Sequence, residues 1–161
     1  MKSAHRVALA LLLVSVGDIA FAAPAVAQPF GIEIGKTTCR QAIPLIRGAT
    51  PEKVDGDGSV LISMRQPETF FAGTIKGSAY CMSLDAPVDF FSMMVVVRGQ
   101  GSIGITGVYD ALASKYLLAR GGLPTVPGQF AATFEANGSV VEFSSKGDGF
   151  MSIKYLSLIH I

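Results

Sequence analysis

Histidine and tryptophan are almost absent from this sequence. It has no tryptophan and two histidines among 161 residues, namely His5 and His160, each close to one end. Histidine is the usual general base near neutral pH and the commonest metal ligand. Its absence from the long central part of the chain disfavours Ser-His-Asp hydrolysis, Cys-His proteolysis and most catalytic zinc sites. We therefore expect a protein that is not an enzyme and that requires no metal or other cofactor.

An excess of charge of one sign is also missing. Outside Lys2, Arg6 and Asp18, the chain has equal numbers of basic and acidic residues, because the totals are 13 and 12. A protein that binds nucleic acid normally has a basic patch or stripe, and so does one that binds anionic lipid. We expect neither a nucleic acid nor an anionic membrane surface as a partner.

The first 27 residues have the pattern of a secretory signal peptide. Residues 1–6 carry two basic side chains, residues 7–16 form an apolar run, and two Ala-x-Ala motifs follow, ending at Ala22 and Ala27. A basic start, a short apolar stretch and a small-residue site define such a signal. The apolar run is about half the length that crosses a bilayer. The pattern predicts an exported protein, with a retained anchor helix as the alternative.

Cleavage is expected after Ala27, or alternatively after Ala22 or Ala23. Export places the mature chain in the periplasm or outside the cell. No cysteine follows the cleavage region closely enough for a lipoprotein anchor, so we expect no stable insertion in the membrane after cleavage.

Cysteine is scarce, with Cys39 and Cys81 the two in the chain. In an oxidising compartment an even pair is read first as a disulfide. Two buried thiols or one reactive thiol are the alternatives. The sequence shows no C-x-x-C motif and no nearby histidine to lower a thiol pKa. The pair is therefore our predicted disulfide.

The last six residues, 156–161, have an unusual composition, Leu-Ser-Leu-Ile-His-Ile. They resemble the conceptual translation of an adapter used in sequencing libraries. This resemblance implies that the domain proper is residues 28–155, truncated at its C-terminal end. The alternative is a genuine final strand.

A helix is expected to begin after Thr38, because Thr38 and Gln41 form a T-x-x-Q capping box. Pro44 should kink the helix or end it early. Alternation of apolar and polar residues predicts strands in this half. They are expected over residues 30–35, 59–65, 74–84 and 90–97. The last is apolar on both faces and is expected to be a central, fully buried strand.

A second helix is expected over residues 107–120, after Thr106 as a cap and before the stop at Gly121 and Gly122. Its apolar stripe is Val108, Leu112, Tyr116 and Ala119. A last strand is expected from residue 151.

The clearest local signal is a hairpin at Asn137 and Gly138. A two-residue Asn-Gly turn pairs Phe134 with Val141 and Ala132 with Phe143. All four apolar side chains then lie on one face of the sheet. We predict an α+β fold, built from two units of one helix and three antiparallel strands, over residues 38–98 and 107–155.

Two glycine-rich segments resemble nucleotide-binding loops without meeting their requirements. Residues 31–37 have three residues between the glycines where a phosphate loop has four. Residues 99–104 match G-x-G-x-x-G, but no acidic residue follows about twenty positions later. Glu68, Asp85 and Asp89 are candidate paired carboxylates, although no spacing places them on one face. We expect a strand end and a surface link at the two glycine segments and solvated loops at the carboxylates.

Several segments give the chain a resemblance to a group of uncharacterised exported proteins of Gram-negative bacteria. They are F-G-I-E-I-G-K-T-T-C from Phe30, A-S-K-Y from Ala113, N-G-S-V-V-E-F from Asn137 and S-I-K-Y from Ser152. The chain is also distantly similar to outer-membrane assembly lipoproteins and tandem-repeat lactamase inhibitors. These resemblances imply a small periplasmic module and transfer no functional residue.

The sequence thus leaves three functions open. The first is an exported binding or accessory module that contacts an unknown envelope protein through a sheet face or edge. The second is a small-ligand carrier with an apolar cavity between helix and sheet. The third is an enzyme that uses carboxylates.

Overall fold

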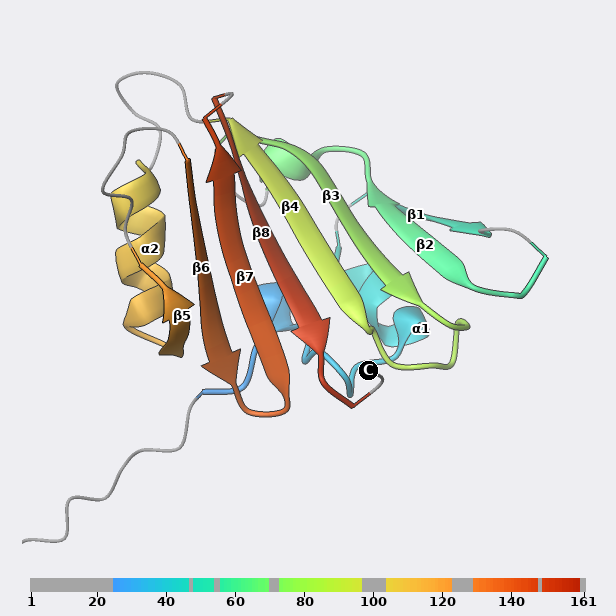
Figure 1. Ribbon diagram of the computed structural model, residues 1–161. Helices are drawn as coiled ribbons and strands as arrows, with labels where there is room; N and C mark the ends of the chain where they lie inside the picture. The colour runs from blue at the N-terminus through green and yellow to red at the C-terminus, as the bar shows by residue number, and fades with distance from the viewer. Residues whose placement is uncertain are drawn as a thin grey trace, which may run out of the picture.

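One antiparallel sheet of eight strands forms the framework of the protein (Figure 1). The computed structural model describes residues 25–46, 48–53, 56–69, 73–96, 104–122, 129–147 and 149–159. The strands are β1 (Ala49–Lys53), β2 (Val60–Met64), β3 (Thr74–Cys81), β4 (Phe90–Val96), β5 (Leu117–Gly121), β6 (Gln129–Ala136), β7 (Ser139–Lys146) and β8 (Phe150–Ser157). The helices are α1 (Cys39–Ala42) and α2 (Ile105–Ala113), with 3-10 turns at Pro29–Gly31, Ile43–Leu45 and Pro67–Thr69.

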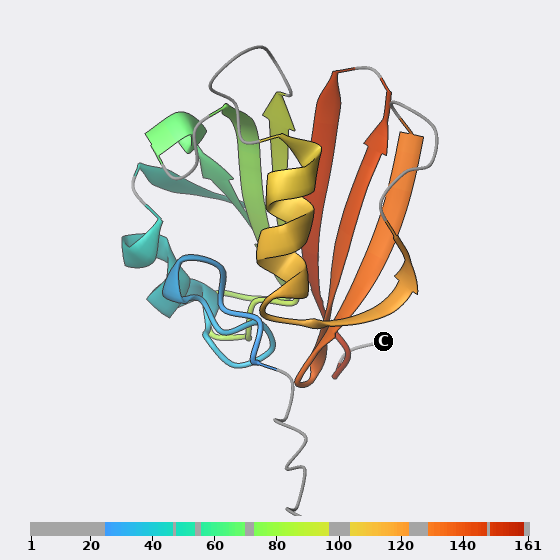
Figure 2. The same ribbon diagram turned by 90° about the vertical axis from the view of Figure 1, so that its left-hand side faces the viewer.

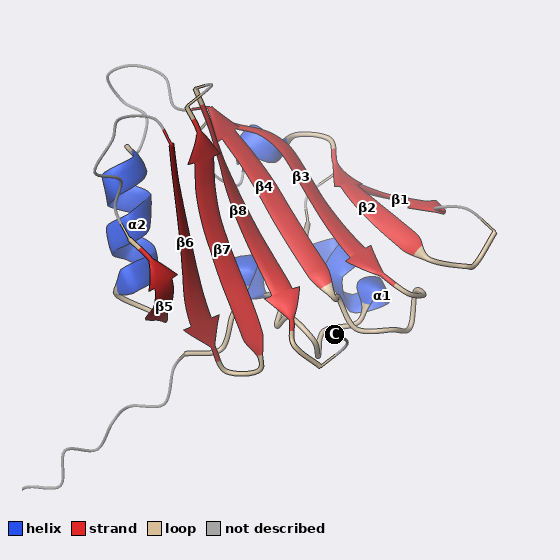
Figure 3. Ribbon diagram, in the orientation of Figure 1, coloured by secondary structure: helices blue, strands red, loops and turns tan. Residues whose placement is uncertain are grey.

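The strand order is β1-β2-β3-β4-β8-β7-β6-β5, with every neighbouring pair antiparallel. Two four-stranded meanders therefore meet where β4 pairs with β8 (Figure 3). The predicted α+β fold with two helix-plus-three-strand units is wrong. The protein is mainly a β-sheet with two short α-helices in its described part. The two strands that the sequence failed to indicate, β1 and β5, lie at the sheet edges.

Strand β1 contains a proline, which is why the sequence pattern concealed it. Pro51 pairs with Ile62 in the first hairpin. Proline cannot donate a ladder hydrogen bond, but an edge strand leaves one side of its backbone without a partner strand. Gly48 and Pro51 are also residues that end helices, so the local pattern is equally typical of the region after a helix.

Strand β5 replaces the predicted second half of the second helix. Helix α2 ends at Ala113, and Leu117 and Leu118 pair with Glu135 and Phe134 of β6. The open edge of β6 has backbone groups that need partners, and this long-range pairing overrides the local helix preference. Gly121 permits the close approach, because a Cβ there would lie 2.1 Å from the Ala131 carbonyl oxygen.

The predicted strand over residues 30–35 is also absent. Pro29–Gly31 forms a 3-10 turn, while Ile32 and Ile34 are buried. Their alternation reflects two side chains that enter the core from an irregular segment. The capping box is confirmed: Thr38 accepts from the Gln41 N–H, and the Gln41 side chain accepts from the Thr38 N–H.

The Asn-Gly hairpin is confirmed in register. Phe134 pairs with Val141 and Ala132 with Phe143, and all four are buried. Strand β4 is central as predicted, but only one of its faces is buried. Met94, on its other face, is 40% exposed. No described helix covers that outer face of the sheet (Figure 1).

The inner face of the sheet is apolar and is covered by two separate groups of elements (Figure 2). Helix α2 crosses the middle of the sheet, where Val108 and Leu112 are buried and the Tyr109 ring lies 5.6 Å from that of Phe134. The N-terminal segment and α1 cover the other part. Phe30 packs there against Phe91, with 5.8 Å between the ring centroids.

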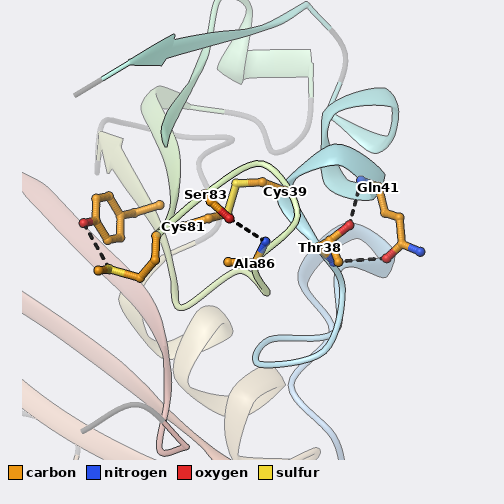
Figure 4. The surroundings of a disulfide bond; sticks show 8 residues. Thr38, Cys39, Gln41, Cys81, Ser83 and Ala86 are labelled. Carbon is orange, nitrogen blue, oxygen red and sulfur yellow. Dashed lines mark hydrogen bonds between the residues drawn. A yellow bond between two sulfur atoms is a disulfide. The ribbon is translucent and has the colours of Figure 1, made fainter. Parts of the chain in front are cut away.

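A disulfide joins Cys39 of α1 to Cys81 at the end of β3, as predicted (Figure 4). The Cα atoms are 6.1 Å apart, and 42 residues separate the two positions. Backbone hydrogen bonds reinforce the junction: the N–H groups of Cys39 and Arg40 donate to the Ala86 and Leu84 carbonyls. The first turn of α1 is thus attached to the loop that follows β3.

Residues 156 and 157 form the last two positions of β8 in the structure. Leu156 pairs with Phe90 and Val140, and Ser157 is buried. Residues 1–24 and both histidines lie outside the described residues.

Replacing both cysteines by alanine should lower the free energy of unfolding by about 4 kcal/mol, because the bridge restricts a 42-residue loop in the unfolded chain. Urea unfolding of the native and C39A/C81A proteins measures the difference. Adding reductant should destabilise the native protein alone. An equal unfolding midpoint for the oxidised protein and the double variant would contradict the bridge's role.

Candidate functional site

A pocket of about 290 Å³ opens between α2, the Pro29–Gly31 turn and the centre of the sheet. It lies where the two coverings of the inner face meet, above strands β4 and β8. Residues from the helix, the sheet and the N-terminal segment line it. Ligand pockets in proteins are typically apolar hollows of this kind with a few polar groups.

Most of the pocket wall is apolar. The sheet contributes Met93 of β4 and Ile153 and Tyr155 of β8. Helix α2 and the turn after it contribute Gly107, Val108, Ala111, Leu112, Lys115 and Tyr116. Gln28, Pro29 and Phe30 close the third side.

Phe30 has an unusual backbone conformation in this wall. Its φ of 55° and ψ of 30° lie in the left-handed region, and it is the one non-glycine residue of the described chain with a positive φ. This conformation costs a residue with a side chain about 1–2 kcal/mol. Packing of its ring against Phe91 compensates for part of that cost. Strained residues of this type concentrate at functional sites.

Two tyrosines contribute the polar groups of the inner wall. Tyr116 and Tyr155 are each 8% exposed. Burial raises the pKa of the Tyr155 phenol well above its usual range, and the nearby Tyr116 raises it further. Burial likewise raises the pKa of Tyr116, while a hydrogen bond with the Gln28 backbone opposes this. Both hydroxyls therefore stay protonated and can donate hydrogen bonds at neutral pH.

Lys115 adds a positive charge to the pocket wall. It follows the last turn of α2, where its N–H donates to the Leu112 carbonyl at 3.0 Å. The side chain is exposed to solvent. Within the described ranges its ammonium makes no ion pair or hydrogen bond.

Two further hollows are weaker candidates. One of about 310 Å³ lies between β1, β2 and Leu84. Another of about 150 Å³ lies among Met94, Lys146 and Phe150 at the far end of the sheet. Neither joins a helix to the inner face. In the described part of the chain, no group of three or more acidic, histidine or cysteine residues is placed to hold a metal ion.

The residues that the sequence singled out lie elsewhere. The Cys39–Cys81 bridge is not part of the pocket wall. Arg40 binds Asp85 by two hydrogen bonds, of 2.8 and 3.2 Å, which lower the pKa of that carboxyl. Glu68 lies in a 3-10 turn and Asp89 directly precedes β4.

The first of the two glycine-rich segments, residues 31–37, forms no nucleotide loop. Lys36 pairs with Glu33 within the first segment. Of the second, Gly104 caps α2 and residues 99–103 are outside the described part. The sequence pattern placed Tyr116 and Val108 in a helical core stripe and did not predict which residues would line a cavity between helix and sheet. The tyrosines at 116 and 155 come together only through the sheet topology.

Comparison with known protein families, with curated proteins and with solved structures found no match to this chain. Among the described residues, no helix has the length and apolarity that crossing a bilayer requires.

Tyr155→Phe should reduce the loss of stability at alkaline pH. Between the usual tyrosine pKa of about 10 and the raised folded value, the folded protein keeps a proton that the unfolded chain has lost. The free energy of unfolding is therefore unaffected by this group below pH about 10 and falls as the pH rises above it. Urea unfolding at a series of alkaline pH values measures the slope. Tyr80→Phe, the control on the outer face, should lose as much stability at alkaline pH as the native protein does. Equal slopes in the two variants would show that Tyr155 does not cause this loss.

Proposed function

We propose that this protein is an exported binding module that holds a small, mainly apolar molecule in the pocket beneath α2. The pocket itself is the observation that carries this proposal. Its wall combines apolar side chains from α2 with others from β4 and β8, and two phenol hydroxyls and one ammonium supply directional contacts. Such a combination is typical of small-molecule sites.

The composition of the pocket favours binding over catalysis. Its described lining contains no carboxylate and no imidazole. A glycosidase-like or other acid–base mechanism needs a pair of titratable groups within reach of the same bond. Because their pKa values are raised, both tyrosines stay protonated at neutral pH and cannot act as bases.

Export is supported by the N-terminal pattern and by the disulfide, since such bridges persist in oxidising compartments. The packing around Ala27 bears on the cleavage site. Ala27 is fully buried and its carbonyl accepts from the Ile34 N–H at 3.2 Å. Cleavage after Ala27 would remove this residue from the core, so we favour cleavage after Ala22 or Ala23.

The intact mass of the exported protein should therefore correspond to an N-terminus at residue 23 or 24. Mass spectrometry of periplasmic material from an expressing cell measures this directly. Ala27→Asp should still be exported but should unfold more easily, because it buries a charge in the core. A mature chain that begins at Gln28 would contradict the proposed site.

Filling the pocket should abolish binding. Ala111 lines the pocket on α2, and Ala113 on the same helix does not. Octanol is a suitable neutral probe, and ligand-observed NMR measures its binding. We expect Ala111→Phe to weaken octanol binding at least tenfold, while Ala113→Phe binds as the native protein does. Equal octanol affinities of the two variants would show that octanol binds outside this pocket.

A second candidate function is contact with an envelope protein through the outer sheet face. Side chains at laterally paired positions form an outer apolar row across five strands: Leu61, Tyr80, Phe90, Leu156 and Val140. All five are only partly buried. Exposed apolar side chains that adjoin one another mark interaction surfaces more often than scattered ones do.

In-cell photo-crosslinking from the outer face tests this second function. Phe90→Ser should remove any specific adduct, because Phe90 lies in the middle of the row. Ser92→Ala, two residues along the same face, should retain it. Adducts that are equal in the two variants would exclude the row as the contact surface.

A further inference from the structure

We propose that the pocket ligand is a single-chain amphiphile, with an apolar chain of about seven carbons and one carboxylate that binds Lys115. This inference rests on the proposed function and adds the chemical class of the ligand. Three features of the pocket support it: an unpaired cation, hydroxyl donors that face a largely apolar wall, and the available volume.

The cation is Lys115. The two ion pairs of the described chain, Lys36 with Glu33 and Arg40 with Asp85, do not involve it. An ammonium at the edge of an apolar hollow repels amines and attracts anions. Partial removal of water there strengthens the attraction relative to a fully exposed pair.

The second feature is the tyrosine pair. Tyr155 is 8% exposed and lines the pocket, and its hydroxyl makes no hydrogen bond to any residue in the described ranges. A phenol hydroxyl without a protein partner in a pocket wall is free to donate to water or to a ligand. A carboxylate oxygen is a strong acceptor and would satisfy it. Because the raised pKa keeps the phenol protonated, it remains a donor to an anion.

The third feature is the pocket volume, which limits the size of the ligand. A water molecule occupies about 30 Å³ of liquid, so about 290 Å³ corresponds to roughly ten non-hydrogen atoms. Octanoate has that size. Its chain would contact the Val108, Leu112 and Ile153 side chains, while its single charge matches the single lysine of the wall.

Three probes of equal chain length test the head group. Octanoate, octanol and octylamine are titrated at pH about 7 into the native protein, K115M and the control K76M, with calorimetry or ligand-observed NMR as the readout. Lys76 lies exposed on β3, outside the pocket. We expect octanoate to bind roughly fivefold tighter than octanol, as one partly exposed charge pair allows, and octylamine to bind more weakly than either.

The variants separate the inference from the proposed function. K115M should lose most of the preference for octanoate over octanol, because only the Tyr155 hydroxyl is then left to favour the carboxylate, and K76M should behave like the native protein. Y155F should weaken octanoate binding more than octanol binding. Equal affinities for octanoate and octanol in the native protein would overturn the carboxylate assignment and leave the proposed function standing. If K76M also lost the preference for octanoate, the carboxylate assignment would be overturned as well. Failure of all three probes to bind the native protein would overturn both.

Discussion

Covering one apolar face of an eight-stranded sheet is the constraint on which the rest of this structure depends. Every strand except the edges directs buried apolar side chains to the same inner face, and the largest of them include Phe91, Phe134 and Phe143. Burying that face provides the main favourable free energy of folding, at about 25 cal/mol per Å² of apolar surface. The chain has only a four-residue helix, a nine-residue helix and an irregular N-terminal segment to do so in its described part.

These coverings are held in different ways, and the pocket is the gap between them. The N-terminal segment and α1 are fixed by the Cys39–Cys81 bridge and by backbone hydrogen bonds to residues 84–88. Helix α2 is held by apolar packing of Val108 and Leu112 and by the strand that follows it. The two coverings meet above β4 and β8, where the two halves of the sheet join, and there neither fills the space completely.

The wall of this pocket contains three features that are unusual in a well-packed core. Phe30 keeps a left-handed backbone there, Tyr155 keeps a phenol in apolar surroundings, and Lys115 lacks an ion-pair partner within the described chain. The first two of these features are unfavourable for folding when taken alone. Their presence in one wall is the pattern expected when a site is maintained for a ligand at some cost in stability. The outer face, by contrast, combines serines with a half-exposed apolar row.

The sequence by itself determined the features that depend on near neighbours: the Thr38 capping box, the early end of the first helix at Pro44 and the register of the Asn137–Gly138 hairpin. It also predicted the disulfide, because an even pair of cysteines in an exported chain is read first as a bridge. Only the tertiary structure decided where α2 ends, because the open edge of β6 takes Leu117 and Leu118 as a strand. Only it created the pocket, because Tyr116 and Tyr155 become neighbours through the pairing of distant strands, which local periodicity does not encode.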